Sequence, residues 1–217
     1  MNTKLKLQLA LQALFITGLS ILTLAPVQAQ ELTLQEQMIH RRAVGGAVWG
    51  MPLVGVRGFL VGTRNDLGGD WNDVVYHSKP QVSRHGFLTA NNQTPYVIGN
   101  FNTKEGPLVV EVPGASDKAK YFGSFVDAWD YPFTDIGPAG ADEGKGGKYL
   151  FLPPGYEGEV PEGYLVFRPN TYAVYAALRP VAEKGATIED QVAYARTLKV
   201  YPLSETGNPP PTNFLDA

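Results

Sequence analysis

The sequence predicts a mainly β domain, a sandwich or jelly-roll-like fold, with one helix before it and another helix at its end. The 217 residues include 24 glycines and 17 prolines, and these residues punctuate strands and turns. Short apolar segments separated by polar turns recur along most of the chain, a pattern typical of packed sheets. Hydrophobic residues make up 44% of the chain, which is enough to bury a core.

The first 29 residues have the layout of a secretory signal peptide. Lys4 and Lys6 precede an apolar run over residues 7–24, Pro26 breaks that run, and Ala29 ends a cleavage site of small residues. A transmembrane anchor is the alternative, but polar residues interrupt the run, and a bilayer span needs ~20 apolar residues. We therefore expect cleavage after Ala29, a periplasmic or secreted protein, and no membrane span after cleavage.

A helix is expected at the start of the mature chain. Thr33 and Glu36 have the spacing of a capping box, in which each side chain satisfies a backbone N–H group of the other residue. Leu34 and Met38 then follow at helical spacing. The pattern predicts a helix over residues 34–48.

The remainder divides into a β-rich domain and a terminal linker. Apolar segments bounded by turn residues predict strands at 86–90, 95–100, 108–112, 121–127, 148–152 and 164–178. Thr187 and Asp190 have the spacing of a second helix start, and that helix is expected to reach about residue 200. The predicted organisation is a signal peptide at 1–29, a helical segment at 30–50, a β-rich domain at 51–201, and a Pro-rich linker at 202–217 that leads to an absent second domain.

Composition disfavours several kinds of function. The chain has no cysteine, which excludes disulfides, a thiolate nucleophile and a cysteine-ligated metal. The net charge is −3 and the charges are dispersed, so no nucleic-acid partner is expected. The histidines, His40, His77 and His85, do not have the spacing of a metal motif, so no metal site is predicted. The sequence indicates no particular cofactor.

The acidic and aromatic segment "FVDAWDYPFTD" supplies the candidate catalytic residues, Asp127 and Asp130. Carboxylates placed among aromatic rings can have a raised pKa and act as acids, or they can bind a polyol. Trp129 between them is a candidate ligand-binding residue. The alternative is that these aspartates form a turn at the end of a strand.

A second polar run, "NNQTPY", packs amides, a hydroxyl and a phenol into six residues, as the lining of a polar pocket would. The candidate ligand-binding residues here are Asn91, Asn92, Thr94 and Tyr96, and Arg168 is added to them from a later segment. The alternative is an Asx-turn that satisfies its own backbone. Convergence of both runs on one pocket would favour an enzyme, whereas separate turns would count against it.

Three longer segments carry a family resemblance: "NNQTPYVIGNFNTKEGPLVVEVP", "YFGSFVDAWDYPFTDIGPAG" and "GKGGKYLFLPPGYEGEVPEGYLVFRPNTYAVYAALRP". Their order resembles the bacterial family called domain of unknown function 1254, over roughly residues 54–179. The resemblance implies an exported, β-rich domain that is usually followed by a second sandwich domain, of unknown-function family 1214. It also carries a loose suggestion of hydrolase activity.

Two hypotheses of different kinds follow. The first is a periplasmic hydrolase-like domain that acts on a small polar molecule. The second is a non-catalytic binding or assembly module, a truncated half of a two-domain protein that pairs with a second domain or forms a homo-oligomer.

Overall fold

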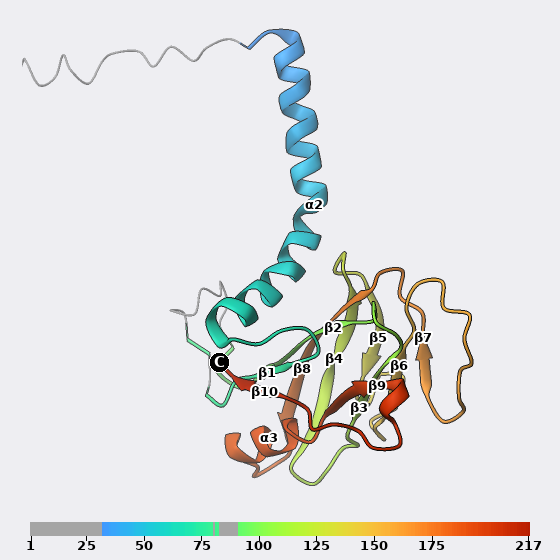
Figure 1. The fold of residues 1–217 in the computed structure, drawn as a ribbon. Coiled ribbons are helices and arrows are strands. Elements are labelled where there is room, and N and C mark those ends of the chain that lie inside the picture. The colour runs from blue at the N-terminus through green and yellow to red at the C-terminus, as the bar shows by residue number, and fades with distance from the viewer. Residues whose placement is uncertain (1–31, 80, 83–90) are drawn as a thin grey trace, which may run out of the picture. The chain divides into compact units, whose positions relative to one another are not determined.

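The computed structural model describes residues 32–79, 81–82 and 91–217. The predicted signal peptide at 1–29 and the predicted strand at 86–90 lie outside these ranges. The chain divides into two compact units, residues 1–47 and 48–217. The first unit contains the start of helix α2 (Leu34–Leu67), and the second contains the rest of that helix and all the described strands (Figure 1).

Helix α2 begins with the predicted capping box. The hydroxyl of Thr33 accepts a hydrogen bond from the backbone N–H of Glu36 at 3.3 Å, and the Glu36 carboxylate accepts one from the backbone N–H of Thr33 at 2.8 Å. The helix is longer than the sequence predicted, because it continues to Leu67. Its glycines each cost only about 1 kcal/mol of helix stability, and burial of Leu60 and Thr63 offsets that cost. The predicted domain boundary at residue 51 therefore lies inside this helix.

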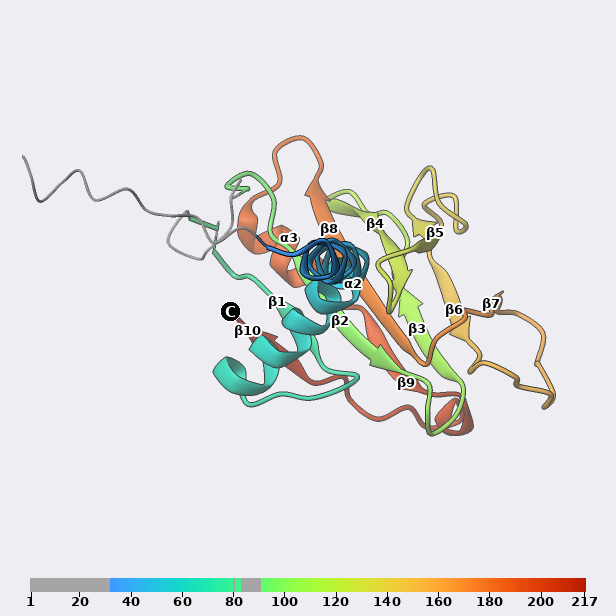
Figure 2. The same cartoon turned by 90° about the horizontal axis from the view of Figure 1, so that it is seen from above.

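The second unit is a sandwich of two sheets, which confirms the mainly β prediction (Figures 1 and 2). The six-stranded sheet has the order β10 (Phe214–Asp216), β1 (Val74–Tyr76), β2 (Val97–Asn102), β8 (Ala173–Ala182), β4 (Ala119–Asp127) and β5 (Pro132–Ile136). The four-stranded sheet has the order β7 (Leu165–Phe167), β6 (Gly147–Phe151), β3 (Leu108–Val112) and β9 (Lys199–Pro202). The short C-terminal helix is α3 (Ile188–Ala195), and a 3-10 turn follows β9 at Leu203–Glu205.

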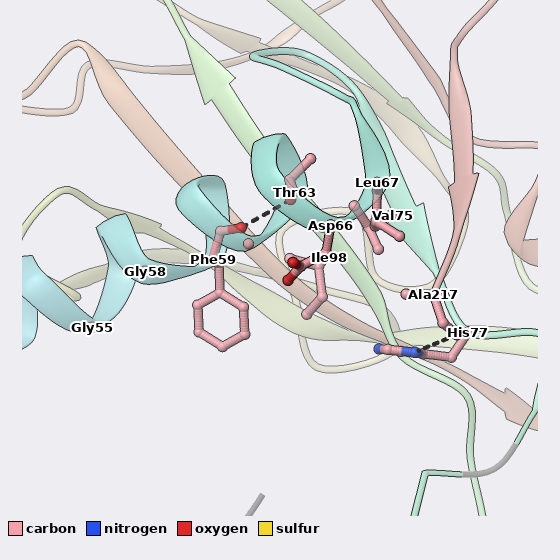
Figure 3. A pocket seen from close by; sticks show the side chains of 11 residues that line it. Gly55, Gly58, Phe59, Thr63, Asp66, Leu67, Val75, His77, Ile98 and Ala217 are labelled. Atoms are coloured by element: carbon pink, nitrogen blue, oxygen red, sulfur yellow. Dashed lines mark hydrogen bonds between the residues drawn. The ribbon is translucent and has the colours of Figure 1, made fainter. Parts of the chain in front are cut away.

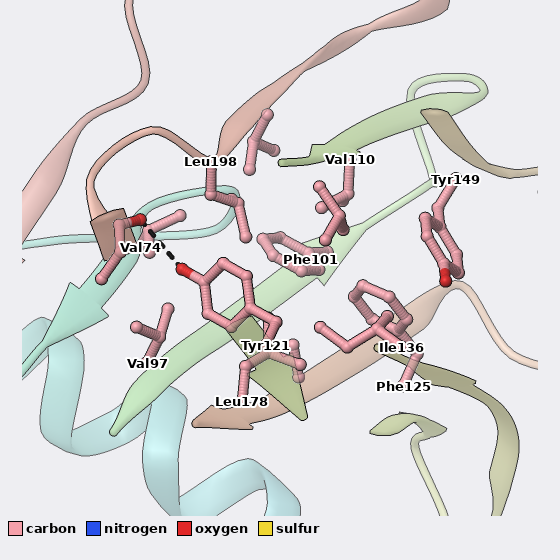
Figure 4. Packing of buried hydrophobic residues seen from close by; sticks show 14 of the residues in the cluster. Val74, Val97, Phe101, Val110, Tyr121, Phe125, Ile136, Tyr149, Leu178 and Leu198 are labelled. Carbon is pink, nitrogen blue, oxygen red and sulfur yellow. Dashed lines mark hydrogen bonds between the residues drawn. The ribbon is translucent and has the colours of Figure 1, made fainter. Parts of the chain in front are cut away.

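The main core lies between the two sheets and is rich in aromatic rings (Figure 4). Phe125 of β4 packs against Tyr149 and Phe151 of β6, with ring centroids 5.3 and 4.8 Å apart. Tyr121 points into the same core and donates a hydrogen bond from its hydroxyl to the backbone carbonyl of Ala195 at 2.9 Å. This bond satisfies the only polar atom of a ring that is 2% exposed.

The outer face of the six-stranded sheet is also apolar, so β8 buries side chains on both of its faces. Val75, Ile98, Val126 and Tyr175 form a second buried cluster on this face. Side chains from the second half of α2 pack against the cluster, and the ring of Phe59 lies 4.9 Å from that of Tyr175. Each strand of this sheet thus alternates between a core-facing and an outward-facing side chain.

Two predicted segments are organised differently in the structure. The predicted strand over 164–178 is two strands, β7 and β8, because Pro169 lies between them and cannot continue a sheet ladder. The segment predicted as a linker, 202–217, contains the 3-10 turn and the strand β10. β10 pairs in parallel with β1 in the register Val74↔Phe214, and Phe214 packs against the main core. Apolar residues after the proline run therefore hold this segment on the sheet.

Among the described residues, one helix is long and apolar enough to cross a membrane, and that helix is α2. No charged residue lies between Arg42 and Arg57, a stretch of about 21 Å at 1.5 Å per residue.

Candidate functional site

A pocket of about 460 Å³ opens on the outer face of the six-stranded sheet, where β4, β5 and β8 meet. We call it the outer-face pocket. Its lining residues are Phe122, Gly123, Ser124, Val126, Asp130, Pro132, Tyr175, Ala177 and Arg179. The register pairs Phe122 with Arg179, Ser124 with Ala177 and Val126 with Tyr175, so these side chains stand in rows on one face of the sheet.

Tyr175 forms the buried wall of this pocket. Tyr175 is 6% exposed as a residue, and its hydroxyl, which remains accessible from the pocket, has no hydrogen-bond partner among the residues that the structure describes. Burial raises the pKa of the Tyr175 phenol well above its ordinary value, and the negative charge of Asp130 and then the neighbouring Tyr96 add to the shift. The hydroxyl therefore keeps its proton at physiological pH and is available as a hydrogen-bond donor.

Asp130 is placed at the rim of the pocket by the hairpin turn between β4 and β5. Its backbone has φ = 60°, the left-handed region that Asp and Asn adopt more readily than most residues. The turn is built by Asp127, whose carboxylate accepts hydrogen bonds from the backbone N–H groups of Trp129 at 2.8 Å and Tyr131 at 3.2 Å. Asp127 is 6% exposed and does not line the pocket. Its geometry is that of the turn-forming alternative.

Arg179 forms the opposite, cationic end of the pocket. Its guanidinium carbon lies 4.8 Å from the centroid of the Tyr96 ring, within the range of a cation–π contact. Arg179 is exposed, and neither it nor Asp130 takes part in an ion pair within the described ranges. Opposite charges thus line one pocket without neutralising each other.

A third polar group, Ser124, lies in the floor of the pocket. Its hydroxyl donates a hydrogen bond to the carboxylate of Asp135 on the adjacent strand at 2.6 Å, and the two residues are direct cross-strand partners. The hydroxyl oxygen keeps lone pairs that can accept a hydrogen bond from a ligand.

The other predicted site residues lie elsewhere. The side-chain oxygen of Asn91 accepts from the backbone N–H of Gln93 at 2.8 Å, and its amide donates to the Thr94 hydroxyl at 2.6 Å, an Asx-turn. Asn92 accepts a hydrogen bond from the side chain of Gln93. The Trp129 ring packs on that of Trp49, with centroids 4.5 Å apart.

Arg168, the remaining predicted ligand-binding residue, follows strand β7 of the four-stranded sheet. It donates a hydrogen bond to the backbone carbonyl of Tyr156 at 2.9 Å and does not line the outer-face pocket. Of the predicted residues, only Asp130 and Tyr96 lie at the outer-face pocket. Asp130 lines it, and Tyr96 lies beside two lining residues, Arg179 and Tyr175.

Sequence reasoning missed Ser124, Tyr175 and Arg179. The available signal was the strand "TYAVYAALR", in which Tyr175 and Arg179 are four residues apart and therefore share a face. A face of a strand that is fully covered by other parts of the protein rarely carries an arginine, so Arg179 indicated that one end of this face is open. What the sequence did not show is that β4, with Ser124, lies beside this strand.

A second pocket, of about 390 Å³, lies between α2 and the sheet edge and is shown in Figure 3. Its lining includes Asp66, His77 and Ala217. Its polar groups are largely engaged within the protein: the Thr63 hydroxyl donates to the carbonyl of Phe59, and the two ring nitrogens of His77 lie 3.3 Å from the Ala217 carbonyl oxygen and 3.1 Å from the Gln81 side chain. Asp66 is the one charged side chain of this pocket without a partner among the described residues, whereas the outer-face pocket combines both signs of charge with the Tyr175 hydroxyl, so it is the better candidate for ligand binding.

The side chains present favour binding by hydrogen bonds and charge. Across residues 32–79, 81–82 and 91–217, no group of three or more His, Asp or Glu side chains is placed to hold a metal ion. Fold and site together define a two-sheet β domain with a polar pocket on an outer sheet face.

Comparison with known proteins identifies the family. Residues 71–202, more than half of the chain, match the model described as "Protein of unknown function (DUF1254)", so the chain belongs to this family. The comparison with curated proteins found no match.

A solved structure shares the fold. The crystal structure of the VPA0106 protein from Vibrio parahaemolyticus superposes with a TM-score of 0.56 at 20% sequence identity. The match covers 75% of this chain but 38% of the Vibrio chain, so the present chain spans well under half of that relative.

Proposed function

We propose that this protein is an exported domain, periplasmic or secreted, that binds a small polar molecule in the outer-face pocket. The observation that carries the proposal is the hydroxyl of Tyr175, which makes no hydrogen bond within the described structure and lines a pocket with Asp130 and Arg179. A phenol hydroxyl is a hydrogen-bond donor, and a ligand with an acceptor group at this place would make a contact that the protein itself does not supply.

The pocket is suited to binding because its walls are fixed before a ligand arrives. Three of its side chains project from paired strands, and the Phe59 ring packs against Tyr175 from the α2 side. A preformed site loses little conformational entropy when the ligand binds. Its volume of about 460 Å³ is within the usual range for small-molecule pockets.

The test compares ligand-induced thermal stabilisation of the wild-type protein with that of Tyr175→Phe, across a library of amino acids, short peptides, sugars and polyols. We expect at least one class to raise the melting temperature of the wild type, and this rise to fall by more than half in the variant. Tyr131→Phe is the matched control, because it makes the same change on a 67% exposed ring of the neighbouring hairpin. Equal responses of wild type and Tyr175→Phe to every ligand would contradict the proposal.

Hydrolysis is a second candidate, and one observation favours it: the hydroxyl of Ser124, which lines the pocket, donates a hydrogen bond to the Asp135 carboxylate at 2.6 Å. In such a reaction the Ser124 oxygen would attack a carbonyl carbon while Asp135 takes the hydroxyl proton. A carboxylate is a weaker base for serine than the usual imidazole, so binding remains the preferred function. Ester turnover that disappears in Ser124→Ala but persists in Ser204→Ala would support hydrolysis.

An assembly function is the third candidate. The second unit exposes large apolar side chains on α2, among them Trp49 at 70%, Met51 at 64% and Val54 at 71%. Exposed apolar groups that gather on one helix mark interaction surfaces. A second domain or a second copy of the chain would cover them, and light scattering of the purified protein, with a mass of two or more chains expected, tests the second copy.

A further inference from the structure

We propose that the ligand of the outer-face pocket is a small zwitterion with well-separated charges, a short peptide with free ends. This inference rests on the proposed function and names the ligand class. Asp130 at one end would hold the terminal ammonium group, and Arg179 at the other end would hold the terminal carboxylate.

The charges in the pocket favour a ligand that carries both signs. The side-chain carboxylate of Asp130 makes no hydrogen bond or ion pair within the described residues. The Arg179 guanidinium contacts the Tyr96 ring and takes part in no ion pair there. A neutral ligand would make no ionic contact with either of these exposed charges. A planar guanidinium binds a carboxylate through two parallel hydrogen bonds, which makes Arg179 the natural partner of a terminal carboxylate.

The spacing of positions along β8 favours a ligand longer than a free amino acid. Tyr175 and Arg179 are four residues apart on β8, so their Cα atoms are about 13 Å apart, and Asp130 lies at the Tyr175 end. The ammonium nitrogen and carboxyl carbon of one amino acid are only about 2.5 Å apart. An extended tripeptide spans about 10 Å, which leaves the remaining distance to the side chains of Asp130 and Arg179.

The middle of the pocket suits a peptide backbone. The Tyr175 hydroxyl is a donor without a partner, and a peptide carbonyl is an acceptor. The Ser124 oxygen can accept from a peptide N–H. Ala177, a small residue in the row between Tyr175 and Arg179, leaves room for the chain.

The experiment is isothermal titration of the wild-type protein with alanine, dialanine and trialanine, and with trialanine blocked at one end by acetylation or amidation. We expect trialanine to bind most tightly and free alanine not to bind measurably. Each blocked form should bind about 10-fold more weakly than trialanine, since it removes one charged contact.

Variants assign each end of the peptide. Arg179→Gln should bind trialanine and its amide equally, and Asp130→Asn, which keeps the left-handed turn, should bind trialanine and its acetylated form equally. The matched controls are Arg168→Gln and Asp117→Asn, exposed residues outside the pocket that should leave the differences intact.

The outcomes separate this inference from the function on which it rests. If trialanine does not bind but a neutral sugar or polyol binds and is lost in Tyr175→Phe, the peptide inference is wrong and the binding function stands. Peptide binding that ignores both blocking groups likewise overturns the inference. If no probe gives binding that depends on Tyr175, both proposals fail.

Discussion

At the scale of single residues, the hydroxyl groups of two tyrosines have different roles. Tyr121 is satisfied by a backbone carbonyl, whereas Tyr175 at the outer-face pocket has no partner in the described structure. Burial is the main cause of a raised pKa at both phenols, and it raises the pKa of Tyr194 to about 12. The same residue type thus serves the core in one place and the candidate site in another.

The raised phenol pKa values predict loss of stability in alkali. Between the ordinary pKa of about 10 and the raised value, the unfolded chain releases protons that the folded chain retains. The stabilisation is therefore complete below pH 10 and is lost as the pH rises above it. We expect the urea midpoint to fall between pH 9 and pH 11.5, and tyrosinate absorbance of the folded protein to lag behind that of the unfolded chain. Identical midpoints at both pH values would contradict this expectation.

Gly137 is a residue that cannot be replaced without strain. Its φ is 90°, and an added Cβ would lie 2.0 Å from the backbone carbonyl oxygen of Tyr121. We expect Gly137→Ala to reduce the free energy of unfolding by more than about 2 kcal/mol, measured by urea denaturation. Gly207→Ala is the control, because a Cβ there meets nothing within 4 Å. Similar losses in both variants would be evidence against the described turn.

At the scale of elements, the hairpin between β4 and β5 connects stability with the candidate site. Asp127 was a candidate acid in the sequence, but its carboxylate holds the turn that places Asp130 at the pocket rim. Pattern alone does not distinguish these roles, since turn aspartates and pocket aspartates both occur at strand ends. The hydrogen-bond partners make the distinction.

A structural role for Asp127 predicts a loss of stability on substitution. Asp127→Ala leaves two backbone N–H groups without their acceptor, so we expect the free energy of unfolding to fall by about 2–3 kcal/mol. Asp117→Ala, on an exposed turn, should change it by less than about 0.5 kcal/mol. If Asp127→Ala is as stable as the wild type, Asp127 does not stabilise the turn, and it becomes a candidate catalytic residue again.

At the scale of the whole molecule, the β class, the capping box and strands β2, β3, β4 and β6 were predictable because they depend on local pattern. The length of α2 and the docking of β10 were not, because they depend on contacts with residues far along the chain. The candidate site follows the same rule. Asp130 and Tyr96 were recognised as polar residues near turns, while Tyr175 and Arg179 became recognisable only when β8 was placed beside β4.

Export is a prediction for the whole molecule. In a host with a general secretion pathway, mass spectrometry of the soluble exported fraction should find Gln30 as the first residue, because the small-residue site ends at Ala29. We also expect the mature protein in the soluble fraction, although α2 is long and apolar enough to cross a membrane. An uncleaved chain would contradict the first expectation, and retention of the mature chain in the membrane fraction after a carbonate wash would contradict the second.

The central claim is that the outer-face pocket binds a small polar ligand, and an NMR titration with trialanine tests it most directly. Amide chemical shifts of the ¹⁵N-labelled protein would be followed as the peptide is added. The account predicts saturable changes concentrated at Ser124, Asp130 and Ala177, and their loss in Tyr175→Phe. Changes concentrated instead around Thr63 and Ile98, in the other pocket, or spectra that do not change with any small polar ligand, would contradict it.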